Sequence, residues 1–217
     1  EKPDAVVKTE AIMPGNPEWL YAQQAGLPVY RRAELLGFLL DGYRHTVGVA
    51  GTNGKTTTTS MITSVYLASG RDFSSIIGGH MKQIDASYCI GKTDEVCIFE
   101  SCEFRDSFLQ FRPSVSVILN IDEDHMEYFK TRENLIASFR RYLNNTREGG
   151  VVIYNAEDEN SLQMIRTYPG KTVSFGLQTG EFTARNVILT AGLPGFEILH
   201  NGAFFCKVQL SVPGRHN

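Results

Sequence analysis

The fold of this chain is decided by one stretch, Gly48-Val49-Ala50-Gly51-Thr52-Asn53-Gly54-Lys55-Thr56-Thr57. An apolar strand over residues 46–50 leads into it, and a helix that ends at Gly70 follows it. In a glycine-rich turn of this kind, backbone N–H groups surround phosphate oxygens and the helix N-terminus adds partial positive charge. The stretch therefore predicts the phosphate-binding loop of a nucleotide site. The less favoured alternative is a glycine-rich turn between strand and helix that binds nothing.

The polar residues of this loop have expected partners. We expect Lys55 to reach the terminal phosphates as a point charge and Thr56 to offer its hydroxyl to Mg²⁺. The spacing is GxxGxxGKT rather than GxxxxGKT, because Val49 occupies the position of the first glycine. The predicted nucleotide contacts are Gly51, Thr52, Asn53, Gly54, Lys55, Thr56 and Thr57.

Strands and helices alternate along the chain up to Phe175. Apolar runs at 96–99 and 115–119 are typical of strands covered on both faces of a parallel sheet, and 132–143 carries the apolar stripe of a helix. After Phe175 the apolar period becomes two, with a tight hairpin expected at Asn201-Gly202. The sequence thus predicts an α/β fold, a mostly parallel sheet with flanking helices plus a small antiparallel three-stranded sheet. The three strands are expected at 182–189, 195–200 and 203–210.

Residues 1–44 precede this core with two short strands and two helices. Asn16-Pro17-Glu18 predicts a capped helix start, and a second helix is expected over 32–40. These elements are too few to bury a core of their own, so we expect a partial Rossmann-like segment that ends another domain, with the boundary between residues 44 and 45. Because the chain begins without methionine, we expect a piece of a longer protein.

Composition excludes several classes of function. The net charge is −3, from 21 Lys and Arg against 24 Asp and Glu, so no broad basic face favours nucleic acid. No apolar run approaches the ~20 residues of a membrane-spanning helix, and the start of the chain lacks the apolar part of a signal peptide. The four cysteines form no CxxC pair, which argues against zinc and for reduced thiols. We therefore expect a cytoplasmic protein that binds neither nucleic acid nor membrane.

Candidate metal ligands come at the ends of the predicted strands over 96–99 and 115–119. Glu100 directly follows the first strand, and Asn120-Ile121-Asp122-Glu123-Asp124-His125 follows the second. In α/β sheets, ligands bind at the carboxyl ends of strands, and Mg²⁺ prefers oxygen ligands. Glu100 is therefore the first candidate. The chemistry alone leaves open whether His125 binds a metal and whether the acidic run is a solvated loop.

Three motifs, in this order along the chain, resemble those of the Mur ligases, ATP-dependent amide ligases that build the peptide of bacterial cell-wall precursors. Residues 51–57 resemble the ATP loop of that family, and Asn-Ile-Asp-Glu-Asp-His-Met at 120–126 resembles its metal motif. Pro213-Gly214-Arg215-His216-Asn217 is similar to the start of its adenine-side motif. The resemblance implies that residues 1–44 are the C-terminal part of a UDP-substrate-binding domain and 45–217 an incomplete central ATP-binding domain.

Within the family, residues 16–18, 28–34 and 100–109 look most like the member that joins L-alanine to UDP-N-acetylmuramate. Later-step members carry a carbamylated lysine where this chain has Arg140, which fits the alanine-adding member. The resemblance implies that ATP phosphorylates the muramyl carboxylate and that the amine of L-alanine attacks the acyl phosphate. It further implies a role in peptidoglycan biosynthesis, and so in cell shape and division, for a monomer or weak homodimer.

The same resemblance assigns roles to site residues. The expected catalytic residues are Lys55, Glu100 and His125. Thr56 and Glu100 would bind one Mg²⁺, and His125 would bind a second near the γ-phosphate. Asn217 would approach the adenine.

Further residues have supporting roles in this hypothesis. Asn120 and Asp124 would orient His125, as neighbours of metal ligands do. The muramyl nucleotide would lie between residues 1–44 and the central domain. His80, on a loop after a strand at 75–77, would touch its pyrophosphate or would be only an exposed loop histidine.

Departures from the family pattern keep two alternatives open. Cys102 and Arg105 replace two acidic residues of a family segment, and Asn53 stands where alanine-adding members have histidine. The alternatives are another ligase of the superfamily, muropeptide-recycling or folylpolyglutamate-like, and a non-catalytic ATP-binding homologue. Because the family's amino-acid-binding domain is not in the sequence, we expect this chain alone to be inactive as a ligase.

Overall fold

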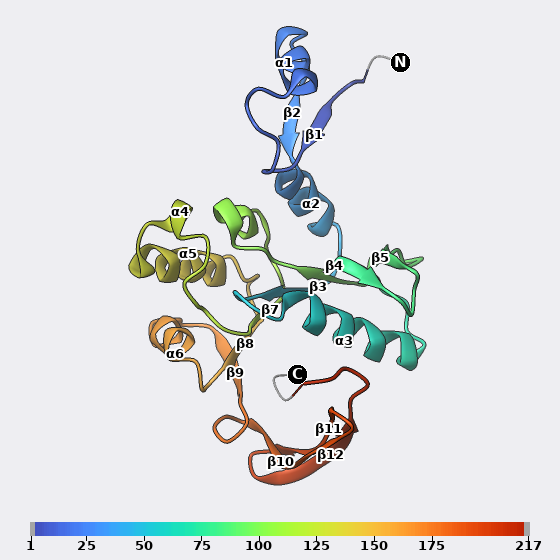
Figure 1. Cartoon of the computed structure of the whole chain (residues 1–217), viewed down its shortest axis with the longest axis vertical. Helices are drawn as coiled ribbons and strands as arrows, with labels where there is room; N and C mark the ends of the chain where they lie inside the picture. The colour runs from blue at the N-terminus through green and yellow to red at the C-terminus, as the bar shows by residue number, and fades with distance from the viewer. Residues whose placement is uncertain (1–2, 215–217) are drawn as a thin grey trace.

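A ten-stranded sheet forms the centre of the structure, a computed structural model that describes residues 3–214 (Figure 1). Its strand order is β12-β11-β10-β9-β8-β7-β3-β6-β4-β5. In chain order the strands are β3 (His45–Ala50), β4 (Ser74–Met81), β5 (Ala86–Cys89), β6 (Val96–Glu100), β7 (Val115–Ile118), β8 (Val151–Asn155), β9 (Lys171–Phe175), β10 (Phe182–Thr190), β11 (Leu193–His200) and β12 (Ala203–Gln209). The strands from β4 across to β9 pair in parallel, which confirms the predicted α/β fold.

The helices pack on both faces of the parallel strands, with α3 below them and α2 above in Figure 1. They are α1 (Pro17–Gln24), α2 (Arg32–Leu40), α3 (Lys55–Ser69), α4 (Met126–Phe129), α5 (Arg132–Asn144), α6 (Glu159–Ile165) and the 3-10 helix η1 (Phe104–Gln110). Side chains cap the starts of α1 and α5, and the cap at Asn16 is the predicted one. Asn16 accepts a hydrogen bond from the backbone of Trp19 before α1, and Thr131 accepts one from Asn134 before α5.

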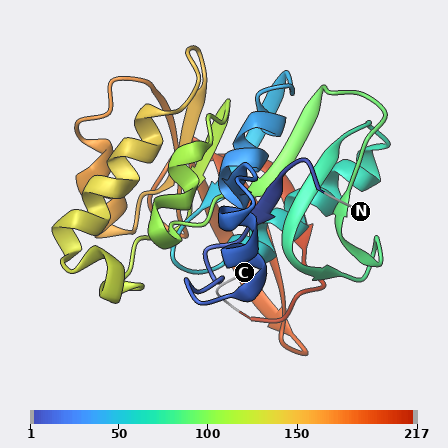
Figure 2. The same ribbon diagram turned by 90° about the horizontal axis from the view of Figure 1, so that it is seen from above.

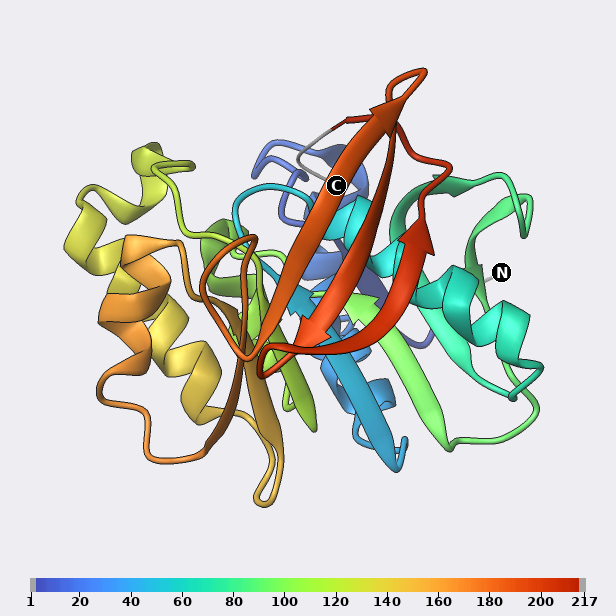
Figure 3. The ribbon, with the colours of Figure 1, turned by 90° about the horizontal axis from the view of Figure 1, so that it is seen from below.

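The last three strands form the predicted antiparallel meander, and Figure 3 shows them in front of the parallel strands when seen from below. They join the large sheet through one backbone pair, Phe175 of β9 with Phe182 of β10. The meander therefore continues the large sheet. The small separate sheet of the structure is the parallel pair β1 (Val6–Lys8) and β2 (Val29–Arg31).

Residues 3–44 lie over the middle of the sheet when the molecule is seen from above (Figure 2). In Figure 1, α1, β1 and β2 project away from the sheet, and α2 connects them to it. Leu40 at the end of α2 is buried in the main hydrophobic core. This segment therefore contacts the central unit mainly through one helix.

The main core lies between the sheet and α5, and aromatic rings fill it. Phe108 of η1 stacks on Tyr142 with ring centroids 4.7 Å apart and meets Phe139 edge to face at 5.1 Å. The Tyr142 hydroxyl donates to Ser101 Oγ at 2.9 Å, and burial raises its pKa. A Cβ at Gly48 would lie 2.6 Å from that hydroxyl, so β3 needs glycine here for α5 to pack closely.

Three short elements differ from the sequence-based expectations. The sequence analysis missed β5, η1 and α4, which have four to seven residues each. β4 continues to Met81, so His80 lies in a strand rather than in a loop after residue 77. Elements this short carry too few periodic positions for a pattern to be recognised. None of the helices within residues 3–214 has both the length and the apolar character to cross a membrane.

The four cysteines are unpaired, as predicted, and Cys97 is the most deeply buried of them. Removal from water raises the pKa of the Cys97 thiol to about 12, because the thiolate would lose its hydration. At pH 8 we therefore expect Cys97 to resist a thiol reagent in the native protein and to react fully in denaturant. Mass spectrometry after labelling checks this, and native-state labelling of Cys97 would contradict it.

Candidate functional site

The loop between β3 and α3 has the shape of a phosphate cradle. Gly51 and Gly54 take positive φ angles of 139° and 85°, which side chains other than glycine disfavour. A Cβ at Gly51 would also lie about 3 Å from Leu119 Cβ and from the backbone of Asn120. Gly54 caps α3, so the loop ends at the N-terminus of a helix of 15 residues. The backbone amides and the helix dipole there favour an anion.

Asn120, at the end of β7, holds this loop in place. Its side-chain oxygen accepts from the backbone N–H of Asn53 at 2.8 Å, and its amide donates back to the Asn53 carbonyl at 3.1 Å. The backbone N–H of Thr52 donates to the Asn120 carbonyl at 3.0 Å. The expectation that Asn120 orients His125 is therefore wrong, because its side chain is committed to the loop.

Lys55 is the first residue of α3 and turns back over the loop. Its ammonium donates to the carbonyls of Gly51 at 2.6 Å and Thr52 at 3.0 Å. It also pairs with both oxygens of Glu103, at 3.2 and 3.0 Å. Glu103 was not among the candidate site residues predicted from the sequence, and its signal there is its place three residues after Glu100.

Thr56 and Glu100, the two residues predicted to share one Mg²⁺, lie in contact. The Thr56 hydroxyl lies 3.2 Å from Glu100 Oε2, and the backbone N–H of Gly78 in β4 donates to the other carboxylate oxygen. A Cβ at Gly78 would lie 2.5 Å from Glu100 Oε2, so glycine leaves room for the carboxylate. A hydroxyl and a carboxylate beside a phosphate loop are the oxygen ligands that Mg²⁺ takes, so these residues fit that ion.

His125 lies in a second group of candidate ligands. It precedes α4 with φ of 53°, and its ring packs 4.7 Å from the ring of Phe104. One ligand atom each from His125, Asp124 and Glu103 fall within 4.8 Å of one another. Asp124 accepts from the His125 backbone N–H at 2.7 Å, which supports the expectation that it positions this residue. The structure thus brings His125 beside Glu103 rather than beside Asn120.

Asp106 fixes the loop that carries Glu103, and the sequence analysis missed it. Arg105 and Asp106 both take positive φ angles, of 50° and 58°. The Asp106 carboxylate accepts from Tyr128 of α4 at 3.0 Å, from Arg141 of α5 at 2.8 Å, and from Ser138 of α5. Burial and this carboxylate raise the pKa of the Tyr128 hydroxyl. Three side chains from two helices, α4 and α5, therefore hold one turn of the site.

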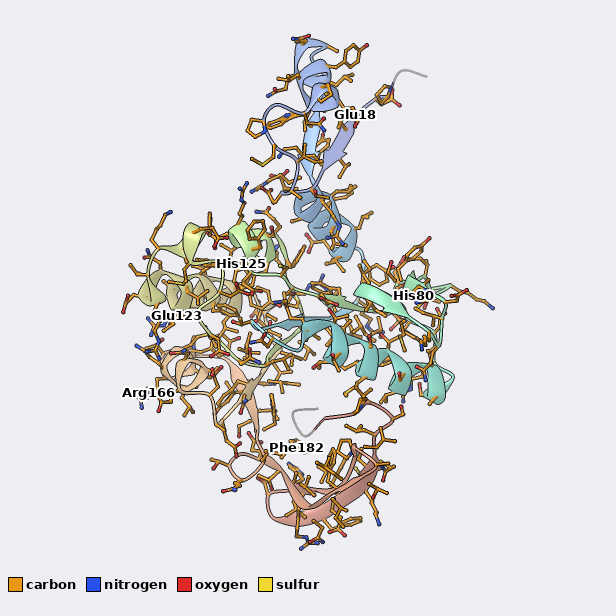
Figure 4. The ribbon with its side chains drawn as sticks, viewed as in Figure 1. Glu18, His80, Glu123, His125, Arg166 and Phe182 are labelled. Carbon is orange, nitrogen blue, oxygen red and sulfur yellow. The ribbon has the colours of Figure 1, made fainter. Side chains whose placement is uncertain are left out.

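The two histidines that the sequence analysis singled out are far apart. Figure 4 shows His125 and His80 at opposite sides of the central unit. His80 Nε2 lies 3.1 Å from Oδ1 of Asp85, which belongs to the turn between β4 and β5. Within residues 3–214, the polar partner of the His80 ring is therefore Asp85 and not one of the other predicted site residues.

A cleft of about 370 Å³ separates residues 9–36 from the central unit and reaches Glu100. An ion pair between Arg105 and Glu10, 3.7 Å apart, joins its two sides. Cys102 is exposed in this cleft. Neighbouring protein atoms displace part of the water around its thiol, which raises the pKa of that thiol. The lining residues are Thr9, Glu10, Ala11, Arg32, Ala33, Leu36, Ile76, Ile77, Gly78, Glu100, Cys102, Phe104, Ser107 and Phe111.

A second pocket, of about 580 Å³, opens on the other side of the loop. It is largely apolar, and Asn53, Gly54 and Thr57 form its edge at the loop. Phe175 and Phe182, from β9 and β10, supply two aromatic rings. Flat rings of this kind can stack on a nucleobase. Asn217, the predicted adenine contact, lies outside the described residues.

A parallel sheet with a glycine-rich loop after its central strand, and carboxylates at neighbouring strand ends, is the arrangement of the P-loop class of α/β proteins. Within that class, the chain belongs to the Mur ligase family, because the model of the Mur ligase middle domain matches residues 49–217.

Individual relatives agree with this assignment. The chain is 40% identical over 216 residues to a UDP-N-acetylmuramate–L-alanine ligase of Agathobacter rectalis, covering 99% of this chain and 47% of the relative. The crystal structure of UDP-N-acetylmuramate-alanine ligase from Thermotoga maritima matches with a TM-score of 0.87 and 27% identity, over 100% of this chain and 48% of that chain.

A different ligase shares the fold. The UDP-N-acetylmuramate:L-alanyl-γ-D-glutamyl-meso-diaminopimelate ligase from Neisseria meningitides has a TM-score of 0.84 at 23% identity, over 98% of this chain and 69% of that chain. At that identity the likeness concerns the fold alone. The chain spans about half the length of the curated relatives it matches.

Proposed function

We propose that this chain is part of an ATP-dependent ligase that joins L-alanine to UDP-N-acetylmuramate in peptidoglycan precursor synthesis. The observation that carries the proposal is the contact between Thr56 and Glu100 beside the glycine loop that Lys55 covers, with Glu100 also lining the cleft under residues 9–36. The relatives at 36–40% identity are named for this reaction. ATP use, the localisation in the cytoplasm, and a monomer or weak homodimer are parts of the same proposal.

The loop residues would bind the triphosphate. The backbone amides of Gly54 and of the first turn of α3 would face the phosphates. Those of Thr52 and Asn53 donate to Asn120 instead. Lys55 would contribute a positive charge, and the aromatic pocket beside the loop would take the base. Asn120 keeps the Asn53 peptide in the orientation that the cradle needs. Transfer of a phosphoryl group depends on such positioning and on neutralised charge.

Thr56 and Glu100 would hold one Mg²⁺, and His125 with its neighbours would hold a second. The ions supply positive charge that lowers the repulsion between the γ-phosphate and the muramyl carboxylate. Gly78 and Asp124 orient these residues through the backbone hydrogen bonds described above.

The cleft would receive the muramyl nucleotide, with residues 1–44 as the end of its binding domain and 45–217 as the central ATP-binding domain. A carboxylate oxygen of the substrate attacks the γ-phosphorus, ADP leaves, and an acyl phosphate forms. The amine of L-alanine then attacks the carbonyl carbon and phosphate leaves. Because Glu100 lines the cleft, the acceptor carboxylate and the phosphate site adjoin.

The test is a product measurement with the full-length protein. Mg·ATP, UDP-N-acetylmuramate and a mixture of amino acids are supplied, and the nucleotide product is weighed by mass spectrometry. We expect an ATP-dependent gain of one alanine residue, and no product from this 217-residue chain alone. Turnover only with another acceptor would indicate a sibling ligase, and ATP binding without turnover would indicate a non-catalytic homologue.

A further inference from the structure

The ammonium group of Lys55 already has four oxygen neighbours. Two are loop carbonyls, of Gly51 and Thr52, and two belong to the carboxylate of Glu103. A lysine has three N–H donors, so these partners occupy its hydrogen-bonding capacity. To contact a phosphate, Lys55 must therefore give up at least one of them.

Glu103 is the partner with the strongest hold on Lys55. Its side chain is 1% exposed, against 15% for Lys55, so little water can replace this ion pair. Leaving a buried carboxylate without a cation is strongly unfavourable. Glu103 therefore keeps Lys55 until another positive charge reaches the carboxylate.

Such a charge has a place to bind. Ligand atoms of Asp124 and His125 lie within 4.8 Å of the Glu103 carboxylate. Glu103 therefore stands between two groups, the phosphate-loop lysine on one side and the candidate metal ligand His125 on the other.

We propose that Glu103 competes with the nucleotide phosphates for Lys55 and so makes nucleotide binding depend on a divalent cation. This rests on the proposed nucleotide site. Without the cation, incoming phosphates meet a lysine whose charge is offset, together with a carboxylate that repels them. A cation near Glu103 and His125 offsets the carboxylate and frees Lys55. By linkage, the cation and the nucleotide then strengthen each other's binding by the same factor.

The test measures ADP binding by the full-length protein, with calorimetry, in EDTA and in saturating Mg²⁺. ADP is the probe because it cannot transfer a γ-phosphate. Glu103→Gln is expected to bind ADP about tenfold more tightly than wild type in EDTA, because removing a like charge beside a phosphate is worth this much or more. The ratio of the ADP affinity in Mg²⁺ to the ADP affinity in EDTA should therefore be smaller for Glu103→Gln than for wild type.

Asp122→Asn is the matched control. It removes a carboxylate beside the same loop, whose Oδ2 lies 3.4 Å from Asn53 Nδ2 and which has no contact with Lys55 among residues 3–214. We expect its affinity in EDTA to stay within about threefold of wild type, as for an exposed charge screened by water. The difference between the two variants isolates the competition for Lys55.

Glu103→Asp keeps the charge but draws the carboxylate away from Lys55 by one methylene group. It should tighten ADP binding in EDTA less than Glu103→Gln does, and it decides the matter if thermal melting shows that Glu103→Gln is unfolded. If Glu103→Gln is folded and binds ADP in EDTA no more tightly than wild type, the inference is overturned. If Glu103→Gln is unfolded, the same result with Glu103→Asp overturns it. Wild type that binds no ADP in either condition overturns the nucleotide site itself.

Discussion

Lys55→Ala is expected to lower the turnover of the full-length ligase by about 10²–10³-fold, measured at a temperature where the variant is folded. Its melting temperature should also fall, because the buried carboxylate of Glu103 loses its cation. The ammonium group of Lys55 lies over the phosphate loop, 2.6 Å from the Gly51 carbonyl. Its loss removes positive charge where negative charge develops as the phosphoryl group moves. Steady-state kinetics with the product assay measures the effect.

Lys171→Ala is the matched control for this variant. Lys171 is exposed and begins β9, at the opposite end of a parallel strand from the loop. Lys171→Ala removes the same charge and the same side chain, but at the other end of the sheet from the loop. The turnover of this variant should therefore stay near wild type. Near-normal turnover of Lys55→Ala would remove the phosphate loop from the mechanism.

Phe108→Ala is expected to lower the free energy of unfolding by about 3–5 kcal/mol, a large share of the ~5–15 kcal/mol typical of a domain. Phe108 is fully buried, stacked on Tyr142 and in edge contact with Phe139. The cavity left by its ring would lie under η1, the 3-10 helix that Glu103 immediately precedes. Denaturant unfolding of the full-length protein, followed by circular dichroism, measures the loss.

Phe38→Ala is the comparison for Phe108→Ala. Phe38 of α2 is 77% exposed, so the same deletion should change the free energy of unfolding by less than about 0.5 kcal/mol. Because Phe108 anchors the turn that carries Glu103, Phe108→Ala should also weaken nucleotide binding at temperatures where the protein remains folded. Equal stability losses in the two variants would contradict the core that the structure describes.

Much of the fold was predictable because its signals are local. The phosphate loop, the cap at Asn16, and the apolar runs of β6 and β7 depend on residues close in sequence. The antiparallel meander followed from a period of two and from one Asn-Gly turn. The sequence did not predict that this meander continues the large sheet, because a single backbone pair, Phe175 with Phe182, makes the connection.

The residue types of the candidate site were predictable from the sequence. Which of these side chains contact one another was predictable only in part. Glu100 and Thr56 meet as expected, because a strand end and a helix start lie at the same edge of the sheet. Asn120 instead binds the loop, 67 residues away in sequence, and Glu103 binds Lys55, 48 residues away. No local pattern distinguishes these choices from the alternatives.

The sequence by itself determined the class of site: a glycine loop, a lysine, a hydroxyl and carboxylates, placed at the strand ends of an α/β fold. The tertiary structure alone decided which groups are paired. β3 lies between β6 and β7, so the ends of those two strands bring Glu103 and Asn120 to the phosphate loop. Strand order arises from packing across the whole sheet, and a side chain's partner is set by that order and by which contacts exclude water.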